Sequence, residues 1–133
     1  MIGRRDFMTA AAMLAAAAEA NAAQTAGQPR TVLTQDLPPV TLNGWTATAV
    51  ELTYAPGAVS QAHRHPGFVL GYVLEGAIRF AINGGEPVTR RAGEMFYEPP
   101  GAVHSVAANA SATEPARFLA IIVAEKGAPL TVT

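Results

Sequence analysis

From Val40 onward, the apolar residues of this chain stand in short runs and not at the spacing of an amphipathic helix. The runs are rich in Val, Ile, Phe, Tyr and Thr, residue types that favour strands. They cover residues 44–54, 68–75, 77–83, 87–91, 94–98, 102–108 and 116–125. Glycine or proline stands in nearly every gap, as in the Asn-Gly-Gly at 83–85 and the Pro-Pro-Gly at 99–101, and both residues favour turns. Short strands at this spacing predict an all-β sandwich or barrel.

The clearest hairpin is expected over residues 77–89. Ile78, Phe80 and Ile82 alternate with smaller or more polar residues, as in a strand with one packed face and one face toward water. The Asn-Gly-Gly at 83–85 supplies the turn, because glycine accepts positive φ.

The first residues have a different character. Arg4 and Arg5 precede Phe7 and Met8, an alanine-rich apolar run follows, and small-residue tripeptides such as Ala20-Asn21-Ala22 end it. An alanine-rich first helix would have a similar composition, but this order is typical of a cleaved signal peptide. The Arg-Arg-x-Phe-Met order resembles the twin-arginine export signal. We therefore expect a signal at 1–23, a linker at 24–38 and a folded domain at 39–130, in a protein that is periplasmic or secreted.

Composition narrows the classes further. The 133 residues suffice for one domain, and the apolar run near the N-terminus is shorter than the ~20 residues of a permanent membrane span. With a net charge of -1, the chain lacks the excess positive charge that attracts nucleic acid, so we do not expect a nucleic-acid-binding protein. The chain has no cysteine, which excludes disulfides, thiolate metal sites and cysteine nucleophiles. Any bound metal must be held by nitrogen and oxygen.

The three histidines are the candidate chemistry of the chain. His63 and His65 are two residues apart, and on a strand this spacing puts both imidazoles on one face. Neutral imidazole is a common ligand of transition metals. His104 follows the Pro-Pro-Gly turn and begins a second apolar run, so it can approach the first pair from another strand.

Two motifs resemble the signatures of the cupin superfamily. Gly57-x5-His63-x-His65 followed by Gly76 is similar to the first signature, and Gly93-x5-Pro99-x-Gly101-x2-His104 is similar to the second. The resemblance spans residues 40 to 125, and every histidine falls on a metal-ligand position of the family. It implies a small, single-domain, jelly-roll-like cupin β-barrel, with one divalent transition metal ion (Fe, Mn, Ni, Cu or Zn) held by His63, His65 and His104 inside an open end.

The chain departs from the cupin pattern in two places. The pattern supplies a glutamate with three or four residues between it and the second histidine, where this chain has Val69 and Leu70. It also places an asparagine four residues after the last histidine, where this chain has Ala108, with Asn109 one residue later. The expected acidic ligand is therefore missing, and the role of the asparagine does not carry over.

Three interpretations of the missing glutamate stay open. The site can be a neutral three-histidine centre with open positions for water or substrate. Another carboxylate, Glu98 or Glu51, can replace the missing ligand. The site can also have become a metal-free binding pocket. A tight turn at Pro100-Gly101 would place Tyr97 opposite His104 and turn Glu98 away, whereas a type II turn would not impose that register.

Around the site we expect an apolar wall that includes Phe68, Val69 and Tyr72, with Tyr97 as a further pocket residue. The polar tips of Tyr72, Tyr97 and Trp45 are candidates for a hydrogen bond to substrate. The expected substrate is therefore small and partly apolar.

The resemblance implies a metal-dependent enzyme, dioxygenase-like or isomerase-like, that acts on a small enolisable or phenolic compound. The residues do not identify a catalytic side chain beyond the metal ligands. The alternative is a non-enzymatic module that binds a small molecule or a metal. Cupins often pair edge strands, so the resemblance also implies a homodimer.

Overall fold

The computed structural model describes residues 27–133, and the expected signal segment lies outside this range. Residues 27–43 of the described part form no helix or strand. Eight strands follow: β1 Trp45–Tyr54, β2 His63–Arg64, β3 Phe68–Glu75, β4 Ala77–Ile82, β5 Val88–Arg91, β6 Met95–Glu98, β7 Val103–Asn109 and β8 Ala116–Glu125. Within residues 27–133, no helix is long and apolar enough to cross a membrane.

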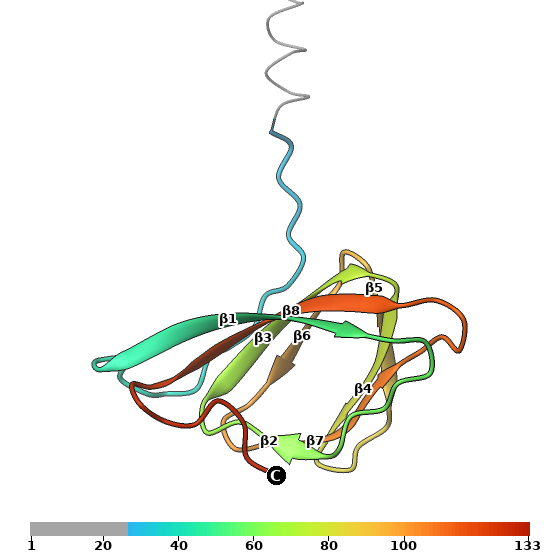
Figure 1. The fold of residues 1–133 in the computed structure, drawn as a ribbon. Coiled ribbons are helices and arrows are strands. Elements are labelled where there is room, and N and C mark those ends of the chain that lie inside the picture. Colours follow the sequence, from blue (N-terminus) through green and yellow to red (C-terminus); the bar gives the residue numbers. More distant parts are fainter. Residues whose placement is uncertain (1–26) are drawn as a thin grey trace, which may run out of the picture. The chain divides into compact units, whose positions relative to one another are not determined.

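The strands form two antiparallel sheets of four, with the orders β1-β8-β3-β6 and β2-β7-β4-β5 (Figure 1). The expected all-β class is confirmed. The predicted hairpin is also present, because β4 pairs with β5 from Ala77 opposite Arg91 to Phe80 opposite Val88. Asn83 and Gly84 both have positive φ in the turn between them, which is the conformation that this turn sequence supports.

The core lies between the sheets. Along β8, the residues from Ala116 to Ala124 alternate between buried and half-buried positions, and the buried set faces the interior. Phe118 and Ile122 of this set join Val69 and Val73 of β3 in the hydrophobic core. The rings of Phe80 and Phe96, on opposite sheets, lie 4.8 Å apart. These contacts close the two sheets around one interior.

A bulge in β7 accounts for the displaced asparagine. Val106 and His104 pair with consecutive residues of β4, so Ser105 is an extra residue in β7. The extra residue moves the inward face of the strand by one position. Asn109 is buried for this reason, while Ala108 is not.

The side chain of Asn109 fastens two loops. Its amide nitrogen donates to the carbonyl oxygens of Tyr54, Ala55 and Glu114 at 3.2, 3.1 and 2.7 Å. Its amide oxygen accepts from the backbone nitrogen of Ser111 at 2.9 Å. Asn109 therefore ties the end of β1 to the β7–β8 loop, and its role is structural.

Candidate metal centre

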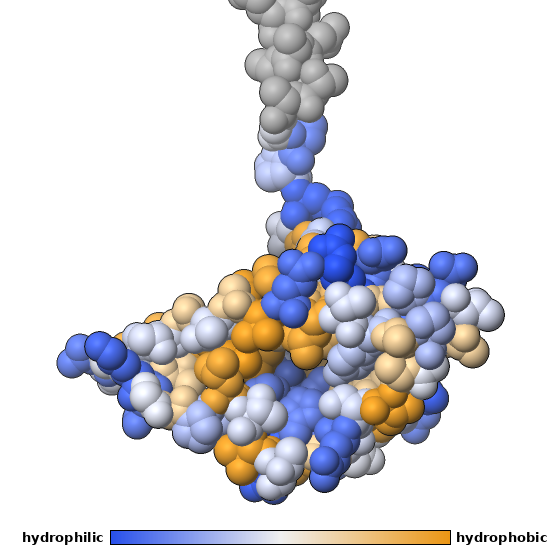
Figure 2. All heavy atoms as spheres, in the orientation of Figure 1, coloured by the Kyte–Doolittle hydropathy of each residue, from blue (hydrophilic) through white to orange (hydrophobic). Residues whose placement is uncertain are grey.

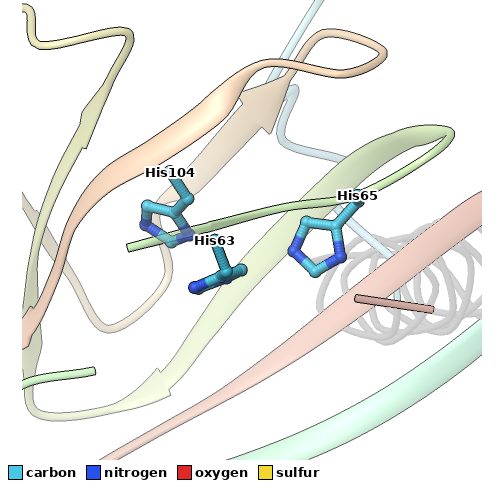
Figure 3. Close-up of side chains that lie close together, drawn as sticks. All are labelled: His63, His65 and His104. Atoms are coloured by element: carbon cyan, nitrogen blue, oxygen red, sulfur yellow. The ribbon is translucent and has the colours of Figure 1, made fainter. Parts of the chain in front are cut away.

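Two neighbouring strands bring the three histidines together. His63 on β2 is directly opposite His104 on β7 in the antiparallel pair, and His65 directly follows the last residue of β2. The ring centroid of His63 lies 5.0 Å from that of His65 and 4.9 Å from that of His104. One ring nitrogen of each lies within 4.8 Å of the others. Figure 3 shows the rings turned toward a common centre, so the cluster can hold a metal ion.

Backbone carbonyl groups orient two of the rings. Nδ1 of His63 donates to the carbonyl oxygen of Gln61 at 2.8 Å. Nδ1 of His65 donates to the carbonyl oxygen of Leu130 at 2.6 Å. A histidine whose Nδ1 carries the donated proton has a free lone pair on Nε2. Both rings are thus held in the tautomer that metal-binding histidines usually adopt.

The carbonyl group that orients His65 belongs to a segment we call the strap, residues 128–133. Arg64 and Val132 exchange two backbone hydrogen bonds, each 2.8 Å long, and this bridge anchors the strap beside β2. Leu130, Thr131 and Thr133 of the strap line the cavity described below. The strap therefore both orients a histidine and forms part of the cavity wall.

Glu98 is the fourth polar group of the cluster. It is only 3% exposed, and it lies directly opposite Val69 in the antiparallel pair of β3 and β6. Its Oε1 is 3.3 Å from Nδ1 of His104, and its Oε2 is 3.8 Å from Nε2 of His65. The register that would turn Glu98 away does not occur, since β6 pairs with β3 and β7 lies in the other sheet.

The second carboxylate considered from the sequence lies elsewhere. Glu51 accepts a hydrogen bond of 2.8 Å from Arg117, and its side chain is 53% exposed. Strand alternation places Glu51 on the outer face of β1, because its neighbours Val50 and Leu52 line the cavity. Glu51 therefore contributes nothing to the cluster.

Burial sets the charge of the cluster. Burial raises the pKa of the Glu98 carboxyl to about 7. Burial, with repulsion from His63 and His65, lowers the pKa of His104 to about 4. Burial also lowers the pKa of His65. Because both histidine shifts favour the neutral ring, His65 and His104 are neutral at pH 7, as metal binding requires.

Three buried polar atoms of the cluster have no hydrogen-bond partner: Oε1 of Glu98, and Nδ1 and Nε2 of His104. Leaving such atoms unpaired costs about 1–3 kcal/mol each. When two ligand atoms each lie about 2.1 Å from one ion and the ligand–metal–ligand angle is about 90–130°, the two atoms are about 3.0–3.8 Å apart. The distances of 3.3 and 3.8 Å from Glu98 to the two histidines fall in this range. The residues present therefore fit a divalent transition metal ion.

A cavity of about 290 Å³ opens beside the cluster. Figure 2 shows a hollow with hydrophilic residues inside it and hydrophobic residues on its rim. The inward residues of β1 and β8 form an apolar wall, and the cluster with nearby polar groups forms the other side. The lining residues are Val50, Leu52, Tyr54, Ser60, Gln61, His63, His65, Phe96, Glu98, His104, Phe118, Ala120, Ile122, Leu130, Thr131 and Thr133.

None of the four pocket residues expected from the sequence lines this cavity. Val69 faces inward but is fully buried in the core. Phe68 and Tyr72 pair with Val123 and Leu119, which alternate with the inward residues of β8. They therefore lie on the face of the sheet away from the cavity, where the side chain of Phe68 is only 2% exposed. Tyr97 faces outward as well, because it alternates with Glu98.

Sequence reasoning overlooked Tyr54, whose side chain does line the cavity. Burial raises the pKa of its hydroxyl group, and a hydrogen bond with the side chain of Ser60 opposes that shift. The signal was present in the sequence, since Val50, Leu52 and Tyr54 alternate with Glu51 and Thr53 as residues on one face of a strand do. Tyr54 and Ser60 are therefore among the polar residues that line the cavity.

Comparisons with known proteins agree with the fold. A cupin-domain family model matches residues 50–122. An uncharacterised Klebsiella pneumoniae protein with a double-stranded β-helix domain is 27% identical, with a TM-score of 0.54, over 65% of this chain and 76% of that one. A predicted oxalate decarboxylase from Thermotoga maritima is 28% identical, with a TM-score of 0.53, over 62% and 69% of the two chains.

A polyketide cyclase from Streptomyces resistomycificus shares the fold at 22% identity and a TM-score of 0.53, over 64% of this chain and 58% of the cyclase. Among curated proteins, no match was found.

Proposed function

Because the chain belongs to the cupin family, we propose that it binds one divalent transition metal ion through His63, His65 and His104 and uses the ion to transform a small molecule. The observation that carries this proposal is the cluster itself. Three imidazole rings converge beside a cavity, and both ring nitrogens of His104 are buried without a hydrogen-bond partner. Neutral imidazole is suited to Fe, Mn, Ni, Cu and Zn.

The remaining residues of the site bind and orient the substrate. When bound, the ion would supply Lewis acidity and a fixed point for substrate oxygens. The apolar residues of β1 and β8 exclude water from one side of the cavity, and the hydroxyl groups of Tyr54, at the end of β1, and of Ser60 offer hydrogen bonds to the substrate. The cavity of about 290 Å³ is at the lower end of the ~300–1,000 Å³ typical of ligand pockets. A small, partly apolar compound fits these properties.

Dioxygenase-like or isomerase-like chemistry on an enolisable or phenolic compound suits this site, because such substrates carry oxygen donors next to an apolar body. The similarity to a predicted oxalate decarboxylase supports chemistry on a small oxygenated compound. The alternative is a binding module without turnover. One observation favours that alternative: in the described part of the chain, Glu98 is the one cavity-lining residue with an acidic side chain, so a pair of carboxylates for acid–base catalysis is not present there.

Metal analysis tests the proposal directly. Protein produced with its export segment should carry about one equivalent of metal, and the double variant His63→Ala, His104→Ala should carry almost none. Equal, sub-stoichiometric metal in both proteins would refute metal binding at this site. Oxygen uptake and product formation with diketones, catechols, flavonols, thiols and oxalate then separate the two functions. Turnover with any of them supports the enzyme, whereas tight binding without turnover supports the binding module.

We also propose export by the twin-arginine route, on the sequence of residues 1–23. Replacing Arg4 and Arg5 with lysine should retain the protein in the cytoplasm, as shown by cell fractionation and immunoblotting. An unchanged distribution of the variant would refute this route. A homodimer stays a prediction, which the molar mass from light scattering would decide.

A further inference from the structure

We propose that Glu98 is the acidic metal ligand of this protein, and that β6 supplies from the neighbouring strand the carboxylate that the family pattern places on β3 at position 69. This inference rests on the proposed metal binding. It replaces three open interpretations of the missing glutamate with one donor set of three nitrogens and one oxygen.

The strand register places Glu98 beside the position at which the family pattern has its glutamate. Val69 and Glu98 are directly opposite each other in the antiparallel pair of β3 and β6. Side chains at such positions leave the sheet on the same face, and their Cβ atoms lie about 4.5–5.5 Å apart. A carboxylate carried by either strand therefore reaches the same region of the interior. Val69 is fully buried. Its apolar side chain has no atom that can bind a metal, so Glu98 is the residue of this pair that can supply a ligand.

The carboxylate group of Glu98 points toward two of the histidines. Nδ1 of His65 is occupied by the carbonyl group of Leu130, so Nε2 is the nitrogen that faces the cluster. Oε2 of Glu98 lies 3.8 Å from this nitrogen, and Oε1 lies 3.3 Å from Nδ1 of His104. Neither Oε1 nor Nδ1 of His104 has a hydrogen-bond partner. Both carboxylate oxygens thus lie near imidazole nitrogens of the cluster, at separations typical of atoms that share one ion.

The buried carboxylate of Glu98 needs a positively charged partner. Among the described residues, the buried polar or charged set comprises Glu98, His65, His104 and Asn109, and Glu98 forms no ion pair with lysine or arginine in that part of the chain. Burying a carboxylate without a positive partner is costly. A divalent ion supplies that partner, and the carboxylate in turn lowers the net charge of the centre from +2 to +1. An oxygen donor also favours harder ions such as Fe and Mn relative to a set of imidazoles alone.

A reciprocal exchange across the two strands tests the assignment, with Co²⁺ as the probe. Glu98→Gln removes the charge with little change in volume and should weaken Co²⁺ binding at least about 10-fold. It should also change the visible spectrum of the Co²⁺ complex. The double variant Val69→Glu, Glu98→Val moves the carboxylate to the family position and should restore most of the affinity. Glu51→Gln, an exposed acid outside the cluster, is the matched control.

The outcomes separate this proposal from the proposed function. If Glu98→Gln binds Co²⁺ with unchanged affinity and spectrum while His63→Ala, His104→Ala does not bind it, Glu98 is not a ligand and the metal site stands. An unchanged spectrum with weaker binding would assign Glu98 to orienting His104 and would also overturn the proposal. If the wild-type protein does not bind Co²⁺, both proposals fail. Circular dichroism establishes folding, and Glu98→Gln decides the matter if the exchanged variant does not fold.

Discussion

In the metal-free protein, the contribution of Glu98 to stability should fall as the pH rises, and Glu98→Gln should remove that contribution. Burial raises the pKa of this carboxyl from 4.5 to about 7, so the folded protein holds a proton that the unfolded chain has released. The stabilisation is complete below pH 4.5, and it disappears as the pH rises through 7. A difference of about 2.5 pKa units corresponds to about 3 kcal/mol. Roughly 2–3 kcal/mol of this falls between pH 5 and pH 8.

His104 acts in the opposite direction over the same range. Its pKa is lowered from 6.5 to about 4, so its contribution to stability is present above pH 6.5 and is lost as the pH falls through 4. In the wild-type protein, the contribution of His104 therefore offsets part of the contribution of Glu98 between pH 5 and pH 8. Since His104 is present in both proteins, its contribution cancels when the variant is compared with the wild type.

Urea unfolding with EDTA, at pH 5 and at pH 8, measures these free energies. From pH 5 to pH 8, the stability of Glu98→Gln relative to wild type should rise by about 2–3 kcal/mol. The exposed control Glu51→Gln should show a change within about 0.5 kcal/mol. Equal pH dependence in wild type and Glu98→Gln would refute the reasoning about burial. In a parallel measurement without EDTA, free Zn²⁺ at 100 times its Kd should stabilise the wild type by about 2.7 kcal/mol.

Three further predictions concern the frame around the site. Val132→Pro removes the backbone N–H group that donates to the carbonyl oxygen of Arg64, so His65 should lose its orientation and metal affinity should fall by about 10-fold. Val132→Ala should bind metal as the wild type does, and equal affinities of the two variants would exclude a role for the strap. Asn109→Ala should cost about 2–3 kcal/mol in urea unfolding, because several buried hydrogen bonds are lost; a cost below about 0.5 kcal/mol would contradict its role in fastening the loops. At Gly71, an added Cβ would lie 2.0 Å from the ring of Phe96, so Gly71→Ala should cost about 1–3 kcal/mol. The double variant with Phe96→Leu should lose less stability than the sum of the two single variants, and strict additivity would show that the ring is not the obstacle.

The sequence carried the strand pattern and the histidines because both depend on local spacing. The hairpin around Asn83 follows from alternation and turn residues, and His63 and His65 share a face because they are two residues apart on extended chain. Position along the chain was enough for these features, since each involves residues that lie near one another in sequence.

The orientation of aromatic side chains was harder to predict. The run from Phe68 to Glu75 is apolar on both faces of β3, so its pattern does not say which residues face inward. The structure places Phe68 and Tyr72 on the outer face. Tyr54, on a strand with clear alternation, faces the cavity. Alternation is informative only where one face of a strand is polar.

By itself, the sequence determined that this protein is built of short antiparallel strands and carries one set of three histidines suited to a metal. The tertiary structure alone decided which strands are neighbours. The pairing of β6 with β3 places Glu98 opposite Val69, and the bulge in β7 turns Asn109 inward. Strand partners far apart in sequence are selected by packing of the whole interior, which no local pattern records. The position of the carboxylate beside the histidines is therefore a property of the fold.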